Sequence, residues 1–259
     1  MNPFDSSDRS PNPPAESTPP PRRVVRPKAP QPMVTFVILG VTVVMYVLQL
    51  AVQASTGNQL LELYLMKINE YIIAGQYWRL ITPVLLHGSP LHLAFNMYAL
   101  YAIGRGLEQQ FGSRRYLLLY LVAGFIGNVV SFLITPNPSL GASTSIFGIV
   151  AAEGVFIYQN RELFGSSARA MLSNTLLVVM LNLFLGATST GIDNWGHLGG
   201  LLGGFAFAWF AGPVWNLNQT IYGYQITDTR SPRAALIVSI AIVVIGSLLV
   251  LQKIMLAGA

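Results

Sequence analysis

The chain has 259 residues, of which 53% are hydrophobic and only 10% are charged, and its mean hydropathy is +0.53. Soluble domains carry about 25% charged residues, so this composition excludes a soluble globular enzyme, a disordered protein and, despite a pI near 9.6, an ordinary DNA-binding domain. The chain has no cysteine, which excludes disulfides and cysteine chemistry, and it has only three histidines, His87, His92 and His197.

Residues 1–32 differ from the rest of the chain. They are rich in proline and carry a basic run from Arg22 to Lys28 without apolar periodicity, which predicts a disordered tail. The composition fits neither a secretory signal nor a transit peptide, because the charges lie far inside and acidic residues are present. The basic run is typical of a topology signal or a contact with anionic lipids rather than of nucleic-acid binding.

Seven apolar runs of membrane-spanning length follow the tail. They cover residues 33–54, 91–107, 116–135, 140–158, 170–187, 195–211 and 234–251. The mixed segment from Ser55 to Leu86 predicts an interfacial loop with short amphipathic helices, and residues 212–233 predict a polar loop. The sequence therefore predicts an all-α, polytopic membrane helix bundle that contacts membrane lipids.

The distribution of lysine and arginine predicts the orientation of this bundle. With the N-terminus in the cytoplasm, the cytoplasmic segments hold twelve of the fifteen basic residues, and Lys67, Arg79 and Lys253 lie outside. Such a bias is typical of cytoplasmic loops. The second, fourth and sixth spans then all begin at the outer face, so their first residues lie at one depth. The absence of eukaryotic sorting signals favours a bacterial plasma membrane.

Polar residues begin each of these three spans. The second span carries His92 and Asn96, which are four residues apart and share a helical face; the fourth begins near Ser143 and the sixth near His197. Polar side chains are costly in a membrane and mark functional sites. The sequence therefore predicts that these four side chains converge near the outer surface.

Small residues indicate how the fourth and sixth spans pack. Gly200 and Gly204 have the spacing that lets two helices approach closely, and His197 lies on the same face. Ser143, Phe147 and Ala151 form a stripe on the fourth span. If these faces pack together, Ser143 and His197 meet.

This arrangement predicts hydrolytic chemistry. A serine hydroxyl is a weak nucleophile that needs an adjacent base, and the neutral imidazole of His197 can take its proton and later protonate the leaving amine. The N–H of Ser143 at a helix N-terminus, with His92 and Asn96, supplies donors for an oxyanion. Asp193 lies in the preceding loop, so we expect a Ser–His dyad without a carboxylate, in a cavity that water enters from outside.

At these residues the chain resembles the rhomboid family of intramembrane serine proteases. The matching motifs, in chain order, are Trp78-Arg79, His92-x-x-x-Asn96, Gly141-x-Ser143, and His197-x-x-Gly200-x-x-x-Gly204. The resemblance implies a six-helix core over residues 33–212, with residues 213–259 forming a loop and an added seventh helix. It also implies that Ser143 is the nucleophile, that His197 is the base, that His92 and Asn96 stabilise the oxyanion, and that transmembrane substrates are cut without a cofactor.

One residue departs from the family pattern. Rhomboid proteases commonly have glycine after the nucleophile, whereas this chain has Thr144, which puts the rate and the choice of substrate in question. Phe147 occupies the position of an aromatic residue that stacks on the catalytic histidine in the family.

Other interpretations remain open. One alternative is a catalytically silent relative that binds transmembrane clients. Another is a small transporter or channel, although transporters carry their polar residues near the midplane. Too few carboxyl groups lie nearby for a metal site. We expect structural roles for three other residues: hydrogen bonding by His87, a loop anchor at Arg79, and pairing of Glu108 with arginines or backbone groups.

Overall fold

The computed structural model describes residues 24–25, 31–189, 191–220 and 223–257. Most of the predicted disordered tail lies outside these residues. The described elements, in chain order, are β1 (Val24–Val25), α1 (Met33–Thr56), α2 (Leu60–Leu65), α3 (Asn69–Ile73), η1 (Tyr77–Leu80), η2 (Thr82–Leu85), α4 (Pro90–Ala99), the π-helix η3 (Leu100–Gly104), α5 (Arg105–Phe111), α6 (Ser113–Ile134), α7 (Ser143–Gln159), α8 (Arg161–Phe164), α9 (Ser167–Thr188), α10 (Asn194–Ala211), β2 (Trp215–Thr220), β3 (Gly223–Asp228) and α11 (Arg233–Ala257).

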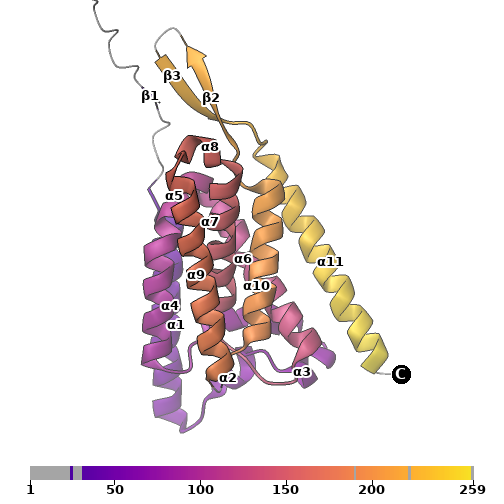
Figure 1. Cartoon of the computed structure of the whole chain (residues 1–259). Helices are drawn as coiled ribbons and strands as arrows, with labels where there is room; N and C mark the ends of the chain where they lie inside the picture. The colour runs from indigo at the N-terminus through magenta and orange to yellow at the C-terminus, as the bar shows by residue number, and fades with distance from the viewer. Residues whose placement is uncertain (1–23, 26–30, 190, 221–222, 258–259) are drawn as a thin grey trace, which may run out of the picture.

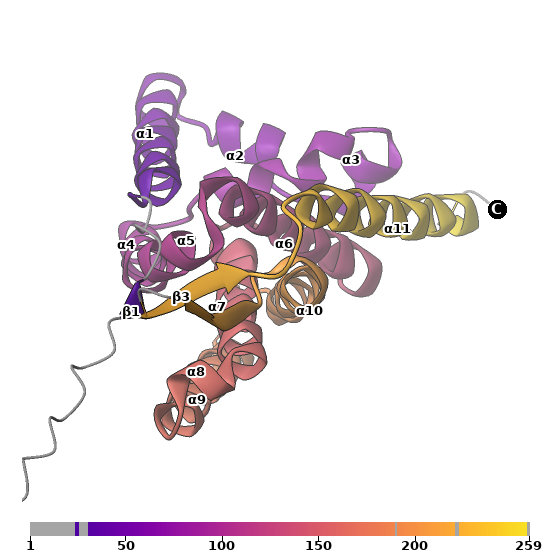
Figure 2. The ribbon, with the colours of Figure 1, turned by 90° about the horizontal axis from the view of Figure 1, so that it is seen from above.

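The long helices stand side by side and form an all-α bundle, as the sequence predicts (Figure 1). Viewed along the bundle, α6, α7 and α10 occupy the centre, whereas α1, α9 and α11 lie at its edges (Figure 2). Within the described residues, four helices are long and apolar enough to cross a membrane, namely α1, α6, α9 and most of α11. The count of seven spans therefore stays a prediction for α4–α5, α7 and α10.

The segment between α1 and α4 contains short helices, as its mixed composition predicts. Arg79 anchors it by donating to the carbonyl oxygens of Leu63 and Met66, each at 2.8 Å, which confirms the expected loop anchor. Lys67 is buried and donates to the carbonyl oxygens of Thr135 and Asn137 just beyond α6. These bonds fix the segment against one end of the bundle.

The polar segment after α10 is more ordered than the predicted loop. Strands β2 and β3 form an antiparallel hairpin, and β1 adds to β3 in parallel. Arg115 at the start of α6 pairs with Asp228 of the hairpin and donates to the carbonyl oxygen of Arg230 at 2.7 Å. The sheet therefore lies at the end of the bundle opposite α2 and α3 (Figure 1).

Glycine lets α10 approach both of its neighbours. A Cβ at Gly199 would lie 2.6 Å from the Cβ of Val130 on α6, and one at Gly200 would overlap the carbonyl group of Thr144 on α7. Gly204 likewise lies directly against the backbone of Gly148. The predicted packing of the Gly200–Gly204 face against the fourth span is confirmed, and it brings the starts of α7 and α10 together.

We expect Gly200→Ala to destabilise the protein by about 1–3 kcal/mol, because the added methyl group must push α10 away from α7. Thermal unfolding in detergent measures the loss. Gly40→Ala on α1 is the matched control, since a Cβ there meets nothing within 4 Å. Equal melting temperatures for the two variants would contradict the close packing.

Candidate active site

Ser143 and His197 come from two different helices and are in contact. Ser143 is the first residue of α7, and His197 lies in the first turn of α10. The Oγ of Ser143 and the Nε2 of His197 are 2.9 Å apart, which is hydrogen-bond distance. The contact predicted from sequence between these two residues is therefore confirmed.

The imidazole of His197 is held between two helices. The ring of Phe147, one turn along α7 from Ser143, stacks on it with a centroid distance of 4.2 Å and an interplanar angle of 14°. The side chain of His197 is buried, and its Nδ1 has no hydrogen-bond partner among the described residues. When Ser143 donates to Nε2, the ring proton of the neutral imidazole is on Nδ1.

Asp193 has a structural role instead of completing a triad. Its side chain caps α10 by accepting the N–H of Gly196 at 2.9 Å, and it also bonds the hydroxyl of Ser131 on α6. Capping satisfies an N–H that has no partner within the helix. The carboxyl group therefore fixes the position of the first turn of α10, and with it the backbone of His197.

Gly141 brings His92 close to the start of α7. Its φ of +134° is a conformation that favours glycine, and a Cβ there would lie 2.9 Å from the Nε2 of His92 and 3.5 Å from the Oγ of Ser143. His92 and Ser143 thus border the same glycine. Since Ser143 is the first residue of its helix, its N–H has no acceptor within α7.

Asn96 lies one turn after His92 on α4 and is buried. Its amide donates to the carbonyl oxygen of His92 at 2.9 Å, within the same helix. This bond keeps Asn96 on the His92 side of the helix. Its predicted contact with an oxyanion stays a prediction, as does the water-filled cavity.

The side chain of Thr144 fits between glycines. A Cβ at Gly127 on α6 would lie 2.6 Å from the Cβ of Thr144, and one at Gly196 on α10 would lie 3.1 Å from its Cγ2. The threonine therefore occupies space that larger residues at these two positions would fill. The sequence marks Thr144 as unusual, but it does not show that two glycines on other helices accommodate it.

His87 differs from its predicted hydrogen-bonding role. Its side chain is only 1% exposed, and neither ring nitrogen has a partner among the described residues. Its backbone makes the bonds instead, since the N–H donates to Gln49 and the carbonyl oxygen accepts from Gln49, both at 3.1 Å. The ring lies 5.0 Å from the ring of His92. Burial, with a smaller contribution from His92, lowers the pKa of His87 to about 3.

This burial predicts a loss of stability in acid. Because the folded-state pKa of His87 is below its ordinary value of 6.5, the neutral imidazole favours folding above pH 6.5, and this stability is lost as the pH falls toward the folded pKa. The slope approaches about 1.4 kcal/mol per pH unit. We expect the melting temperature in detergent to fall less between pH 6.5 and about pH 4.5 for His87→Phe than for wild type. Parallel curves would contradict this assignment.

Within the described part of the chain, no group of three His, Asp or Glu side chains is placed to hold a metal ion. The arrangement instead joins a hydroxyl to an imidazole, with a helix N-terminus and a second imidazole beside them. Such a set can attack a carbonyl carbon and stabilise the charge that develops on its oxygen.

Comparison with known proteins shows the family of the chain. The family model described as the rhomboid domain matches residues 74–214, more than half of the chain. The chain is 39% identical over 175 residues to the rhomboid protease GluP of Bacillus subtilis. The aligned residues cover 68% of this chain and 34% of GluP. It is 35% identical over 133 residues to the putative rhomboid protease YdcA of the same organism, covering 51% of this chain and 65% of YdcA.

A plant relative is more distant in sequence. RHOMBOID-like protein 9, chloroplastic, from Arabidopsis thaliana is 33% identical over 158 residues, which cover 61% of this chain and 36% of that protein. The matches thus span only about a third of GluP and of the plant protein. The matched family domain includes all four predicted site residues, and together with the apolar helices it shows that the chain is a multi-pass membrane protein of the rhomboid family.

Proposed function

We propose that this protein is an intramembrane serine endopeptidase that cleaves transmembrane substrates near the outer face of the membrane. The observation that carries the proposal is the 2.9 Å contact between the Oγ of Ser143 and the Nε2 of His197. Two relatives named as rhomboid proteases support the same reaction class.

Ser143 attacks the scissile carbonyl carbon while the Nε2 of His197 takes the hydroxyl proton. The resulting oxyanion is stabilised by the N–H of Ser143 and by the side chains of His92 and Asn96. His197 then protonates the leaving amine, and the peptide C–N bond breaks to leave an ester on Ser143. Water, deprotonated by His197, hydrolyses that ester and restores both side chains.

The distribution of basic residues supports an outer-face location for this reaction. Lys67 and Lys253 both bind carbonyl oxygens at the end of α6, on the side where α7 and α10 begin. Arg115 and Arg230 lie at the opposite, sheet-bearing end. Because basic residues gather in cytoplasmic segments, we propose that the sheet is cytoplasmic and that Ser143 lies near the outer face of the cell membrane.

A fluorophosphonate probe tests the nucleophile directly, because it reacts with activated serines. We expect the purified protein in detergent to be labelled at Ser143 and the Ser143→Ala variant to remain unlabelled. Ser139→Ala is the matched control, since Ser139 lies in the preceding loop and contacts Lys67 through its backbone. Labelling that persists in Ser143→Ala would contradict the proposal.

A cleavage assay separates the proposed enzyme from a silent relative. A transmembrane substrate with helix-breaking residues exposes its carbonyl groups, so we expect it to be cut by wild type. Binding of that substrate by the folded wild-type protein without any product would favour a client-binding protein instead.

A further inference from the structure

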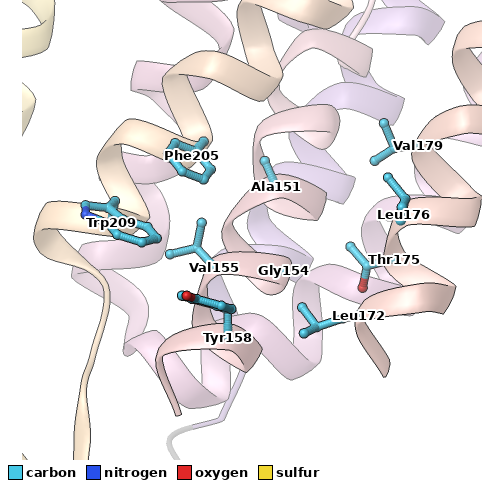
Figure 3. A pocket seen from close by; sticks show the side chains of 10 residues that line it. All are labelled: Ala151, Gly154, Val155, Tyr158, Leu172, Thr175, Leu176, Val179, Phe205 and Trp209. Carbon is cyan, nitrogen blue, oxygen red and sulfur yellow. The ribbon is translucent and has the colours of Figure 1, made fainter. Parts of the chain in front are cut away.

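An apolar groove lies on the bundle between α7, α9 and α10 (Figure 3). It encloses about 250 Å³. Its lining residues are Ala151, Gly154, Val155, Tyr158, Leu172, Thr175, Leu176, Val179, Phe205 and Trp209. Tyr158, Leu176 and Phe205 are exposed although they line it, so the groove opens on the outer surface of the bundle.

Helical periodicity builds this groove from regular stripes on α7 and α9, and Phe205 and Trp209 of α10 complete it. Residues 151, 154, 155 and 158 on α7 and residues 172, 175, 176 and 179 on α9 each follow the spacing of a single helix face. Gly154 leaves space on the α7 side. With a rise of about 1.5 Å per residue, the groove begins about 12 Å along α7 from Ser143 and ends about 22 Å from it. It is therefore separate from the candidate active site.

Aromatic rings and arginines gather where the groove ends. The rings of Tyr158 and Trp209 stack at 6.0 Å, and the guanidinium of Arg161 lies over the Tyr158 ring at 4.9 Å. Arg169 precedes Leu172 by three residues and so lies on the face of α9 that lines the groove. Both arginines are exposed, and the exposed Glu162 is the acidic residue between them in sequence.

We infer that this groove binds one anionic phospholipid, with an acyl chain along the apolar stripes and the phosphate between Arg161 and Arg169. A membrane protein meets lipid chains along its apolar surface, and aromatic rings favour the level of the headgroups. The two arginines outnumber the one glutamate, so a negative headgroup is favoured over a neutral one. The inference depends on the membrane location of the chain and not on its proposed catalytic activity.

Quenching of tryptophan fluorescence tests this site, because Trp209 lines the groove. The full chain is placed in phosphatidylcholine vesicles that contain dibrominated acyl chains on a minor fraction of either phosphatidylglycerol or phosphatidylcholine. The difference between wild type and Trp209→Phe isolates the signal of Trp209. We expect its quenching to show about a fivefold preference for phosphatidylglycerol, the effect of about one arginine contact.

Variants separate the groove from general contact with lipid. Gly154→Leu fills the groove and is expected to abolish the preference, whereas Gly40→Leu on the exposed surface of α1 retains it. Changing both Arg161 and Arg169 to Gln is expected to remove the preference, whereas Arg105→Gln, which removes another arginine stacked on a tyrosine, leaves it unchanged.

Three results would overturn the inference. Equal quenching by the two brominated lipids would show no headgroup recognition. An unchanged preference for phosphatidylglycerol in Gly154→Leu would show that Trp209 senses only surrounding lipid. Loss of quenching on addition of a transmembrane substrate peptide would show that the groove holds peptide instead.

Discussion

Replacing Ser143 with alanine is expected to lower the cleavage rate of a transmembrane substrate by at least about 10⁴-fold. The variant keeps the fold, because a hydroxyl at the first residue of α7 is exchanged for a hydrogen and its helix contacts remain. The measurement is the initial rate of product formation in detergent or vesicles, with the melting temperature recorded for each variant.

His197→Ala is expected to lower the rate by a similar factor. The hydroxyl is a weak nucleophile without its base, so the two residues act as a unit. The cleavage rate of the double variant should therefore lie within about threefold of the rate of either single variant. Strict additivity of the two losses would show that Ser143 and His197 act independently. Ser139→Ala, which changes a neighbouring serine, should retain the wild-type rate.

His92→Ala and Asn96→Ala separate the oxyanion proposal from the nucleophile. Each removes one side-chain donor, so the expected loss in rate is about 10²–10³-fold for a group that contacts the oxyanion. Labelling of Ser143 should continue in both variants, because the contact between Ser143 and His197 remains. An Asn96→Ala rate equal to that of wild type would assign Asn96 to packing alone.

The contact between Ser143 and His197 could be predicted because several simple signals agree. Hydropathy predicts the spans, and charge bias predicts their direction. Because consecutive spans alternate in direction, the second, fourth and sixth spans start at one depth. The Gly200–Gly204 spacing on α10 then predicts a face for close helix packing, and in the structure this face lies against α7. Each signal is local, but together they define a contact between residues 54 positions apart.

The helices that carry the site are shorter than the other long helices, with 10, 17 and 18 residues in α4, α7 and α10. α4, α7 and α10 are absent from the helices that meet the length and composition criterion, whereas α1, α6, α9 and α11 meet it. α4 is only 10 residues long before the π-helix, and α10 begins Asn-Trp-Gly-His. Polar residues that serve a site reduce the apolar signal of the helix that bears them.

Other features depend on alternation or on distant partners, which a hydropathy window does not detect. Apolar and polar residues alternate in Trp215-Asn-Leu-Asn, a strand pattern whose average is polar, and so average hydropathy predicts a loop where the hairpin lies. The imidazole of His87 is buried without a hydrogen-bond partner among the described residues, whereas Gln49, 38 residues away, bonds its backbone. The sequence gives no signal for that pairing.

The carboxyl group of Glu108 binds the start of α1. The sequence predicts pairing with arginines or backbone groups, and the structure confirms the backbone alternative. Its carboxyl oxygens accept the N–H of Val34 at 2.9 Å, the N–H and hydroxyl of Thr35, each at 2.7 Å, and the hydroxyl of Ser113 at 2.6 Å. Glu108 thereby caps α1, whose own N-cap residue is a proline without a side-chain bond.

Glu108→Ala is therefore expected to destabilise the protein by about 2–6 kcal/mol, because two N–H groups at the start of α1 lose their acceptor at about 1–3 kcal/mol each. The melting temperature in detergent should fall by on the order of 10 °C. Glu108→Gln keeps one acceptor oxygen and should lose about half as much. Glu162→Ala, which removes an exposed glutamate on α8, should change stability by less than about 0.5 kcal/mol. If Glu108→Ala and Glu162→Ala have the same melting temperature, the cap contributes little to stability, and α1 is held by its apolar contacts with the bundle.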